Sequence, residues 1–88
     1  MMVLVICRPV SDGDQELFSR SLADEADALR RLQESGTLVQ AWSAGRPGAV
    51  LMLDVIDLPE GTELAARLPL AKAGLISTEV IPLHPLTF

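Results

Sequence analysis

The chain of 88 residues is poor in the side chains on which several classes of protein depend. It has one cysteine, one histidine and no tyrosine. Seven Lys and Arg residues against twelve Asp and Glu residues give a formal net charge of −5. A single cysteine excludes an internal disulfide and fits a reducing compartment. The negative balance argues against nucleic acid and anionic membrane surfaces as partners, because both require a basic patch.

Long apolar runs are also missing. No stretch reaches the ~20 apolar residues that cross a bilayer, and the apolar start at residues 1–6 is too short for a signal peptide and follows no basic region. We therefore expect a cytoplasmic protein. One histidine and one cysteine do not suffice for a zinc site, so no metal is expected. Residues 1–88 are expected to form a single domain, because so short a chain cannot build a second core.

Aliphatic side chains are abundant. Hydrophobic residues make up 49% of the chain, although only two Phe and one Trp are aromatic. A small monomer buries only about 60% of the surface that its unfolded chain exposes. Part of this apolar surface is therefore expected to be covered by another copy of the chain, in a homodimer or a higher oligomer.

The spacing of apolar residues predicts one long helix over residues 14–35. Its apolar stripe recurs every three or four positions, at Phe18, Leu22, Ala26, Leu29 and Leu32. Gly36 follows as the residue that ends the helix. A short second helix is expected over residues 62–68, with Thr62 as its N-cap.

Four apolar segments predict strands, at residues 2–8, 37–43, 50–56 and 76–81. With the two helices they give the order βαββαβ, which is the ferredoxin-like α+β arrangement of a four-stranded antiparallel sheet with both helices on one face.

The first strand indicates what the other face of this sheet looks like. Alternation places Val3, Val5 and Cys7 on one side of that strand, and Met2, Leu4, Ile6 and Arg8 on the other. Both sides are mainly apolar, so the face without helices is expected to pack against the sheet of a second copy.

Several short sequence patterns follow one another along the chain. They are Glu34-Ser35-Gly36, Trp42, Gly45-Arg46, Asp54-Val55, Leu68-Pro69-Leu70, and a final Glu79–Leu83 with His84-Pro85 behind it. In this order, and over nearly the whole chain, they resemble the muconolactone delta-isomerase family. The resemblance implies a ferredoxin-like βαββαβ fold within the dimeric α+β barrel superfamily.

The same resemblance implies an activity, which is proton transfer that moves the double bond of an unsaturated lactone in aromatic catabolism. It implies no metal and no organic cofactor. It also implies kinship with polyketide cyclases, which share the fold. One departure concerns position 40, where the isomerases usually carry a histidine. Gln40 stands there, and an amide cannot shuttle a proton near neutral pH.

Two residues are candidates for the proton transfer. Asp54 interrupts an apolar strand, and a buried carboxylate of this kind suits a general base. The alternative is that Asp54 lies at the strand's outer end and caps a turn or pairs with Arg46 or Arg8. His84 is the only side chain of a type that titrates near neutrality. Its alternative is a place on the surface or in a dimer contact.

Three residues are candidates for substrate binding. Arg8 offers planar donors to a substrate carboxylate, and its alternative is one half of a structural salt bridge. Trp42 offers a wall for a flat ligand, although a Trp in a strand is more often core. Gln40 is included because of its position in the family pattern. Cys7 is expected to be a small buried hydrophobe, and Glu79 to be solvated at a strand edge.

Two functions from different classes follow. The first is a cofactor-free isomerase or cyclase-like enzyme acting on a small unsaturated carbonyl compound. The second is a non-catalytic, homo-oligomeric binding module that keeps the fold and has lost the chemistry. Convergence of Asp54, Arg8 and His84 on one cavity would favour the enzyme.

Overall fold

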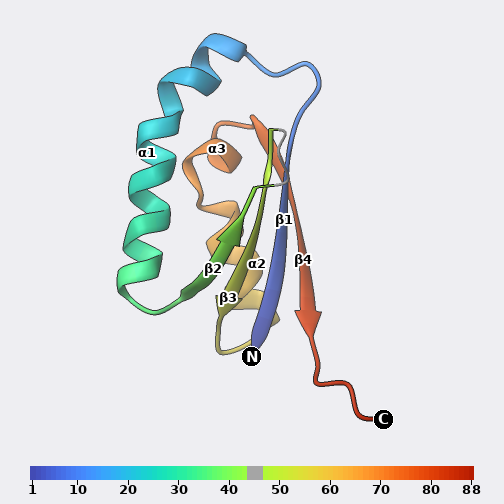
Figure 1. Cartoon of the computed structure of the whole chain (residues 1–88). Coiled ribbons are helices and arrows are strands. Elements are labelled where there is room, and N and C mark those ends of the chain that lie inside the picture. The colour runs from blue at the N-terminus through green and yellow to red at the C-terminus, as the bar shows by residue number, and fades with distance from the viewer. Residues whose placement is uncertain (44–46) are drawn as a thin grey trace.

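The computed structural model of the protein describes residues 1–43 and 47–88. Four antiparallel strands form one sheet, in the order β2-β3-β1-β4. The strands are β1 (Met2–Pro9), β2 (Leu38–Trp42), β3 (Ala49–Asp54) and β4 (Ile76–Leu83), and the helices are α1 (Gln15–Glu34), α2 (Leu58–Ala66) and α3 (Pro69–Lys72). All three helices lie on the same side of the sheet (Figure 1). The predicted ferredoxin-like α+β class is confirmed.

The long helix α1 has the boundaries that its sequence predicts. At its start, the backbone N–H of Leu17 donates a hydrogen bond to Asp14 Oδ1 over 3.0 Å, which satisfies one of the free donors of the first turn. At its end, Gly36 adopts a φ of 82°, a conformation that costs a glycine little. In the described part of the chain, no helix is long and apolar enough to cross a membrane.

The second helix was placed too late in the sequence. The predicted N-cap was Thr62, but α2 begins at Leu58, and Asp57 Oδ1 accepts a hydrogen bond from the backbone N–H of Glu60 over 2.9 Å. Pro59 occupies the first turn, where a backbone N–H would have no hydrogen-bond partner within the helix. The chain then forms the separate helix α3, because Pro69 starts a new turn where the prediction continued the old one to residue 68.

The last strand is longer than predicted. β4 continues beyond residue 81 to Leu83 and includes Pro82, which pairs with Val3. Proline is tolerated there because β4 is an edge strand of the sheet. Beyond β4 the chain runs away from the body of the molecule in an exposed tail (Figure 1).

The core lies between the sheet and the helices. Leu51, Leu53, Val3 and Val5 are its largest fully buried side chains. Leu68 and Leu70 close it from the helix side. Cys7 is buried on the same face, as expected. The predicted alternation along β1 is confirmed, since Val3, Val5 and Cys7 are all buried whereas their neighbours on the strand are not.

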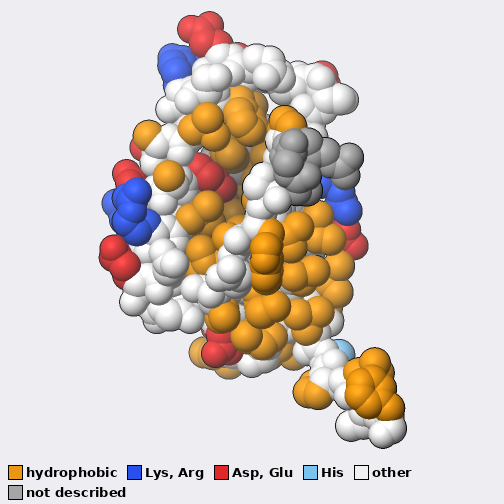
Figure 2. Space-filling view, in the orientation of Figure 1, with side chains coloured by type: hydrophobic (Ala, Val, Ile, Leu, Met, Phe, Trp, Pro, Cys, Tyr) orange, Lys and Arg blue, Asp and Glu red, His pale blue; other side chains and the backbone are white. Residues whose placement is uncertain are grey.

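The opposite face of the sheet carries no helix. The strand register brings Leu4 beside Met52 on β3 and beside Ile81 on β4. We call this surface the open face, and its apolar residues are Met2, Leu4, Ile6, Trp42, Val50, Met52, Ile81 and Leu83. Figure 2 shows a broad group of hydrophobic side chains over the strands. Apart from Trp42, which is exposed, these residues are half-buried in the single chain.

The core predicts a clear difference between two aliphatic residues. Replacing the buried Leu51 by alanine is expected to lower the free energy of unfolding by about 2–5 kcal/mol, because it removes packed methyl groups and leaves a cavity. The matched change Ile56→Ala is expected to alter it by less than about 0.5 kcal/mol, because Ile56 is 84% exposed. Urea denaturation at one protein concentration measures both, and equal losses in the two variants would contradict this description of the core.

Candidate active site

A cavity of about 380 Å³ lies between α1 and the sheet. Its described lining residues are mostly apolar, and they are Cys7, Phe18, Leu22, Glu25, Leu29, Ser43, Pro47, Gly48, Ala49, Leu51, Leu70 and Ile76. Figure 2 shows the hollow between α1 and the strands, with acidic atoms among the hydrophobic ones. Its volume falls in the range of small-molecule sites, which are typically apolar with a few polar groups.

Glu25 is the one buried charged side chain among the described residues, with 9% of its surface exposed. Its Oε1 accepts a hydrogen bond of 3.0 Å from the backbone N–H of Leu70. That donor lies in α3, 45 residues further along the chain. The two helices therefore hold the carboxyl group between them, at the wall of the cavity.

Burial raises the pKa of Glu25 above its ordinary value of 4.5, because the charged form loses its solvation. The hydrogen bond from Leu70 opposes this shift, since it favours the carboxylate. Burial is the larger effect. A carboxyl group whose pKa moves toward neutrality can both take and return a proton under working conditions.

The thiol of Cys7 lines the same cavity. Burial, and in second place the negative charge of Glu25, raise the pKa of this thiol to about 11. Cys7 is therefore a neutral thiol near pH 7, which is a weak hydrogen-bond donor and a poor nucleophile. Ser43 adds a hydroxyl group to the described lining. The site thus combines one proton-transfer group with two neutral donors.

Within residues 1–43 and 47–88, no three His, Cys, Asp or Glu side chains are close enough together to hold a metal ion. What this site offers is acid-base chemistry by Glu25 in apolar surroundings.

Glu25 is not among the site residues predicted from the sequence. The predicted apolar stripe of α1 passed through Ala26, but Ala26 is exposed and its neighbour Glu25 is buried. A signal was present, because Glu25 lies three residues after Leu22 and four before Leu29, and so shares their face of the helix. An acidic residue at that spacing indicates a buried carboxyl group and hence a candidate site.

Asp54 does not line this cavity. It lies at the end of β3, its side chain is 62% exposed, and its Oδ1 is 3.6 Å from the N-terminal ammonium group. This matches the alternative in which Asp54 sits at the outer end of the strand, with Met1 as its partner in place of the arginines. Arg46, one of those arginines, lies outside the described residues.

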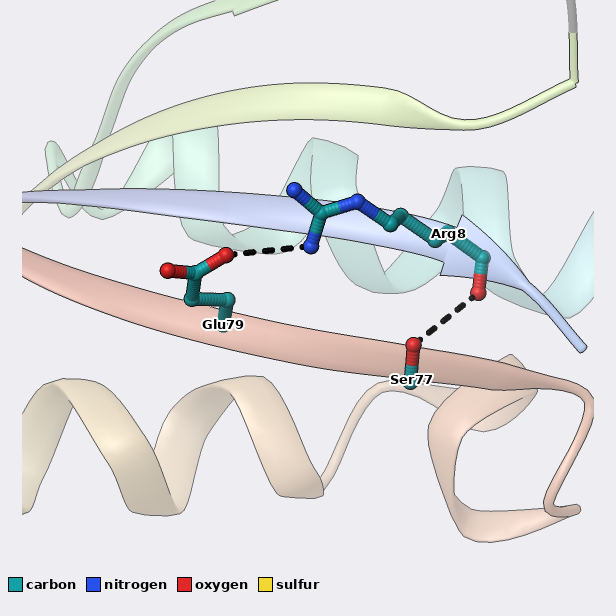
Figure 3. A network of polar contacts seen from close by, with 3 residues as sticks. All are labelled: Arg8, Ser77 and Glu79. Carbon is teal, nitrogen blue, oxygen red and sulfur yellow. Dashed lines mark hydrogen bonds and ion pairs between the residues drawn. The ribbon is translucent and has the colours of Figure 1, made fainter.

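Arg8 and Glu79 meet on the open face, where Arg8 Nη1 donates to Glu79 Oε1 over 3.0 Å. Figure 3 shows the two side chains reaching toward each other from neighbouring strands, with the Ser77 hydroxyl near the carbonyl oxygen of Arg8. Both charged side chains are more than half exposed, so the pair contributes little to stability. This is the salt-bridge alternative for Arg8.

The remaining candidates are also separate from Glu25. Trp42 and Gln40 lie on the edge strand β2, and Trp42 is 46% exposed. Gln40 lines a different depression beside α1. His84 is exposed in the tail after β4. Asp54, Arg8 and His84 therefore do not converge on the cavity, and a catalytic or binding role for these five residues stays a prediction.

The chain resembles several solved structures. One is muconolactone isomerase, with a TM-score of 0.77, 29% sequence identity, and coverage of 99% of this chain and 94% of that one. The chain is a structural relative of muconolactone isomerase. This confirms the resemblance that the sequence patterns indicated.

Another solved structure is 5-chloro-2-hydroxyhydroquinone dehydrochlorinase (TftG) from Burkholderia phenoliruptrix AC1100, in complex with 2,5-dihydroxybenzoquinone. It has a TM-score of 0.74 and 20% identity, and covers 96% of this chain and 94% of that one. At this identity the likeness concerns the fold alone. No family model matches the chain, and no curated protein does.

The buried carboxyl group predicts a pH-dependent contribution to stability. Because the pKa of Glu25 is raised on folding, the folded chain binds more protons than the unfolded chain at pH values above the ordinary 4.5. Glu25 thus costs no stability below pH 4.5, and its cost grows as the pH rises through the folded pKa. Glu25→Gln is expected to unfold at higher urea concentration than the original protein near neutral pH, with the advantage shrinking toward pH 4.

Glutamine is a suitable replacement because its side-chain oxygen can still accept the hydrogen bond from Leu70. The control is Glu34→Gln, which removes an exposed carboxylate from the end of the same helix. Urea denaturation across the pH range compares the three proteins. A Glu25→Gln curve that runs parallel to the original at every pH would show that this carboxyl group is not perturbed by folding.

Proposed function

We propose that this protein is a muconolactone isomerase-like enzyme, which moves a double bond within a small unsaturated lactone or related carbonyl compound by proton transfer and without a cofactor. The observation that carries the proposal is Glu25, a buried carboxyl group at the wall of an apolar cavity of about 380 Å³. The structural likeness to muconolactone isomerase, at 29% identity over 99% of the chain, supports the same reaction class.

The proposed reaction needs one group that accepts and then returns a proton. The Glu25 carboxylate removes a proton from the saturated carbon atom next to the conjugated double bond, and the electron pair of that C–H bond passes into a dienolate. The protonated Glu25 then delivers the proton to the other end of the dienolate, and the double bond has moved. The raised pKa of Glu25 makes its carboxylate a stronger base than an exposed one.

Two neutral donors are available for the negative oxygen of the dienolate. They are the Cys7 thiol, kept protonated by its pKa of about 11, and the Ser43 hydroxyl. A neutral donor in an apolar site stabilises charge that develops during the reaction better than it does in water.

A dehydrochlorinase-like reaction is a second candidate on the same site. It too begins with removal of a proton by a base, after which chloride leaves, and the TftG structure shows that this fold serves such an enzyme. A polyketide cyclase-like reaction also depends on acid-base chemistry at a carbonyl compound. All three enzymatic alternatives use Glu25, whereas the non-catalytic binding module does not need a buried carboxyl group at a cavity.

Rates of double-bond migration in a butenolide, followed by ultraviolet absorbance, test the proposal. Glu25→Gln is expected to lower kcat by about 10²–10⁴-fold, which is the usual contribution of a general acid-base residue. Asp54→Asn and His84→Asn, which alter the two groups favoured by the sequence alone, are expected to stay within about threefold because both lie away from the cavity. A Glu25→Gln enzyme as fast as the original would remove Glu25 from the mechanism.

We also propose that the protein is a homodimer or a higher oligomer in which the open face is covered by a second copy. Leu4, Met52 and Ile81 form the middle of a contiguous apolar surface, whereas exposed apolar patches of this kind are uncommon on monomers. The Arg8–Glu79 pair lies at one end of that surface, which gives it the apolar centre and polar rim of a typical interface.

Substitution at the middle of the open face tests this assembly. Leu4→Asp is expected to shift the protein from oligomer to monomer in sedimentation experiments, because a carboxylate would be buried between two sheets without a partner. Ile56→Asp is the matched control, since Ile56 is an exposed aliphatic residue outside the open face. A protein that sediments as a monomer before any substitution would contradict the assembly.

A further inference from the structure

A second, smaller cavity adjoins the one that holds Glu25. It measures about 120 Å³ and is lined by Pro9, Val10, Gly13 and Leu75, with Gln15 at the start of α1. Phe18 and Pro47 line this cavity and the larger one. These two residues therefore form the boundary between them. We call the smaller cavity the side pocket.

The chemistry of the side pocket suits an apolar group. Its lining includes Val10, Leu75 and Phe18, two prolines, and no charged residue among those described. Its volume is close to that of an engineered apolar cavity of about 150 Å³ that stays dry and binds benzene. An ordered water molecule would need two to four polar partners, and Gln15 has the one polar side chain among the described lining residues. The side pocket thus matches a short alkyl chain or a small ring.

Local structure keeps the side pocket open. A Cβ atom at Gly13 would lie 3.0 Å from Val10 Cγ2 and 3.6 Å from Leu75 Cδ2, so the absence of a side chain there leaves space between the walls. Phe18 is held by the first turn of α1, where its backbone N–H donates to the carbonyl oxygen of Asp14 over 2.9 Å. The boundary residue Phe18 is therefore anchored in a capped helix start.

We propose that the side pocket binds an apolar substituent on the ring that occupies the larger cavity. This inference rests on the proposed function, and it names the substrate class: an unsaturated lactone or related cyclic carbonyl compound that carries an alkyl or aryl substituent. The ring lies beside Glu25, and the substituent passes between Phe18 and Pro47. These two residues decide which substituents fit.

Calorimetric titration with two saturated lactones tests the proposal. The probes are butyrolactone and its butyl derivative, neither of which has a double bond to move, so binding is measured without turnover. The butyl derivative is expected to bind at least about tenfold more tightly, since each buried methylene contributes about fourfold. In Val10→Phe, where a phenyl ring fills the side pocket, this preference is expected to fall below about twofold while the affinity for butyrolactone itself stays the same.

Ser11→Phe is the matched control, because it places the same ring on the adjacent exposed residue, outside the side pocket, and is expected to keep the preference. If Val10→Phe does not fold, Gln15→Phe replaces it, because Gln15 is the exposed first residue of α1 and also lines the side pocket. This variant is likewise expected to lose the preference for the butyl derivative.

Two outcomes would overturn the side pocket while leaving the proposed function in place. One is equal affinity for the two lactones in the unaltered protein. The other is a Val10→Phe variant whose affinity for the two lactones falls by the same factor. The proposed function is tested separately, by the loss of the rate of double-bond migration that Glu25→Gln causes on an unsubstituted butenolide. If neither lactone binds, the side pocket is overturned and the proposed function loses its substrate class.

Discussion

The arrangement of the site depends on one hydrogen bond, from the backbone N–H of Leu70 to Glu25 Oε1. A carboxyl group placed among apolar residues is unfavourable unless it has a partner. Here the partner is a peptide group of the short helix α3: the backbone nitrogen of Leu70 lies 3.0 Å from Glu25 Oε1, and the Leu70 side chain packs into the core. The contact ties together segments that are 45 residues apart. Cavity, carboxyl group and helix packing therefore form one structural unit.

Most of the fold follows from patterns that are local in the sequence. Alternation of apolar residues identifies β1, and a spacing of three and four identifies α1, because each pattern matches the geometry of a single element. The errors are at the boundaries of α2 and β4: Asp57 caps a helix that the prediction began at Thr62, and β4 continues from residue 81 to Leu83. Both depend on which residues cap or border an element, and boundaries are less well determined than periodicity.

The site was much harder to predict than the fold. Glu25 is absent from the residues predicted from the sequence, since an acidic residue is rarely buried, and the donor that compensates its burial comes from a helix that was not predicted. Asp54 and His84 were the predicted catalytic residues, because each differs in chemistry from the apolar residues around it. Both are exposed. Only the packing of α1 against α3 shows which carboxyl group lies at a cavity.

The partner of Glu25 is a main-chain group, and this affects how the site can diverge. A peptide N–H is present in every residue except proline, so exchange of a lining side chain such as Leu22, which is exposed, would reshape the wall of the cavity without removing the hydrogen-bond donor of Glu25. Substitutions of single lining residues can therefore change which ligand fits, while Glu25 and its hydrogen-bond donor stay in place. A scaffold with this separation between anchor and wall is well suited to the evolution of related enzymes with different substrates.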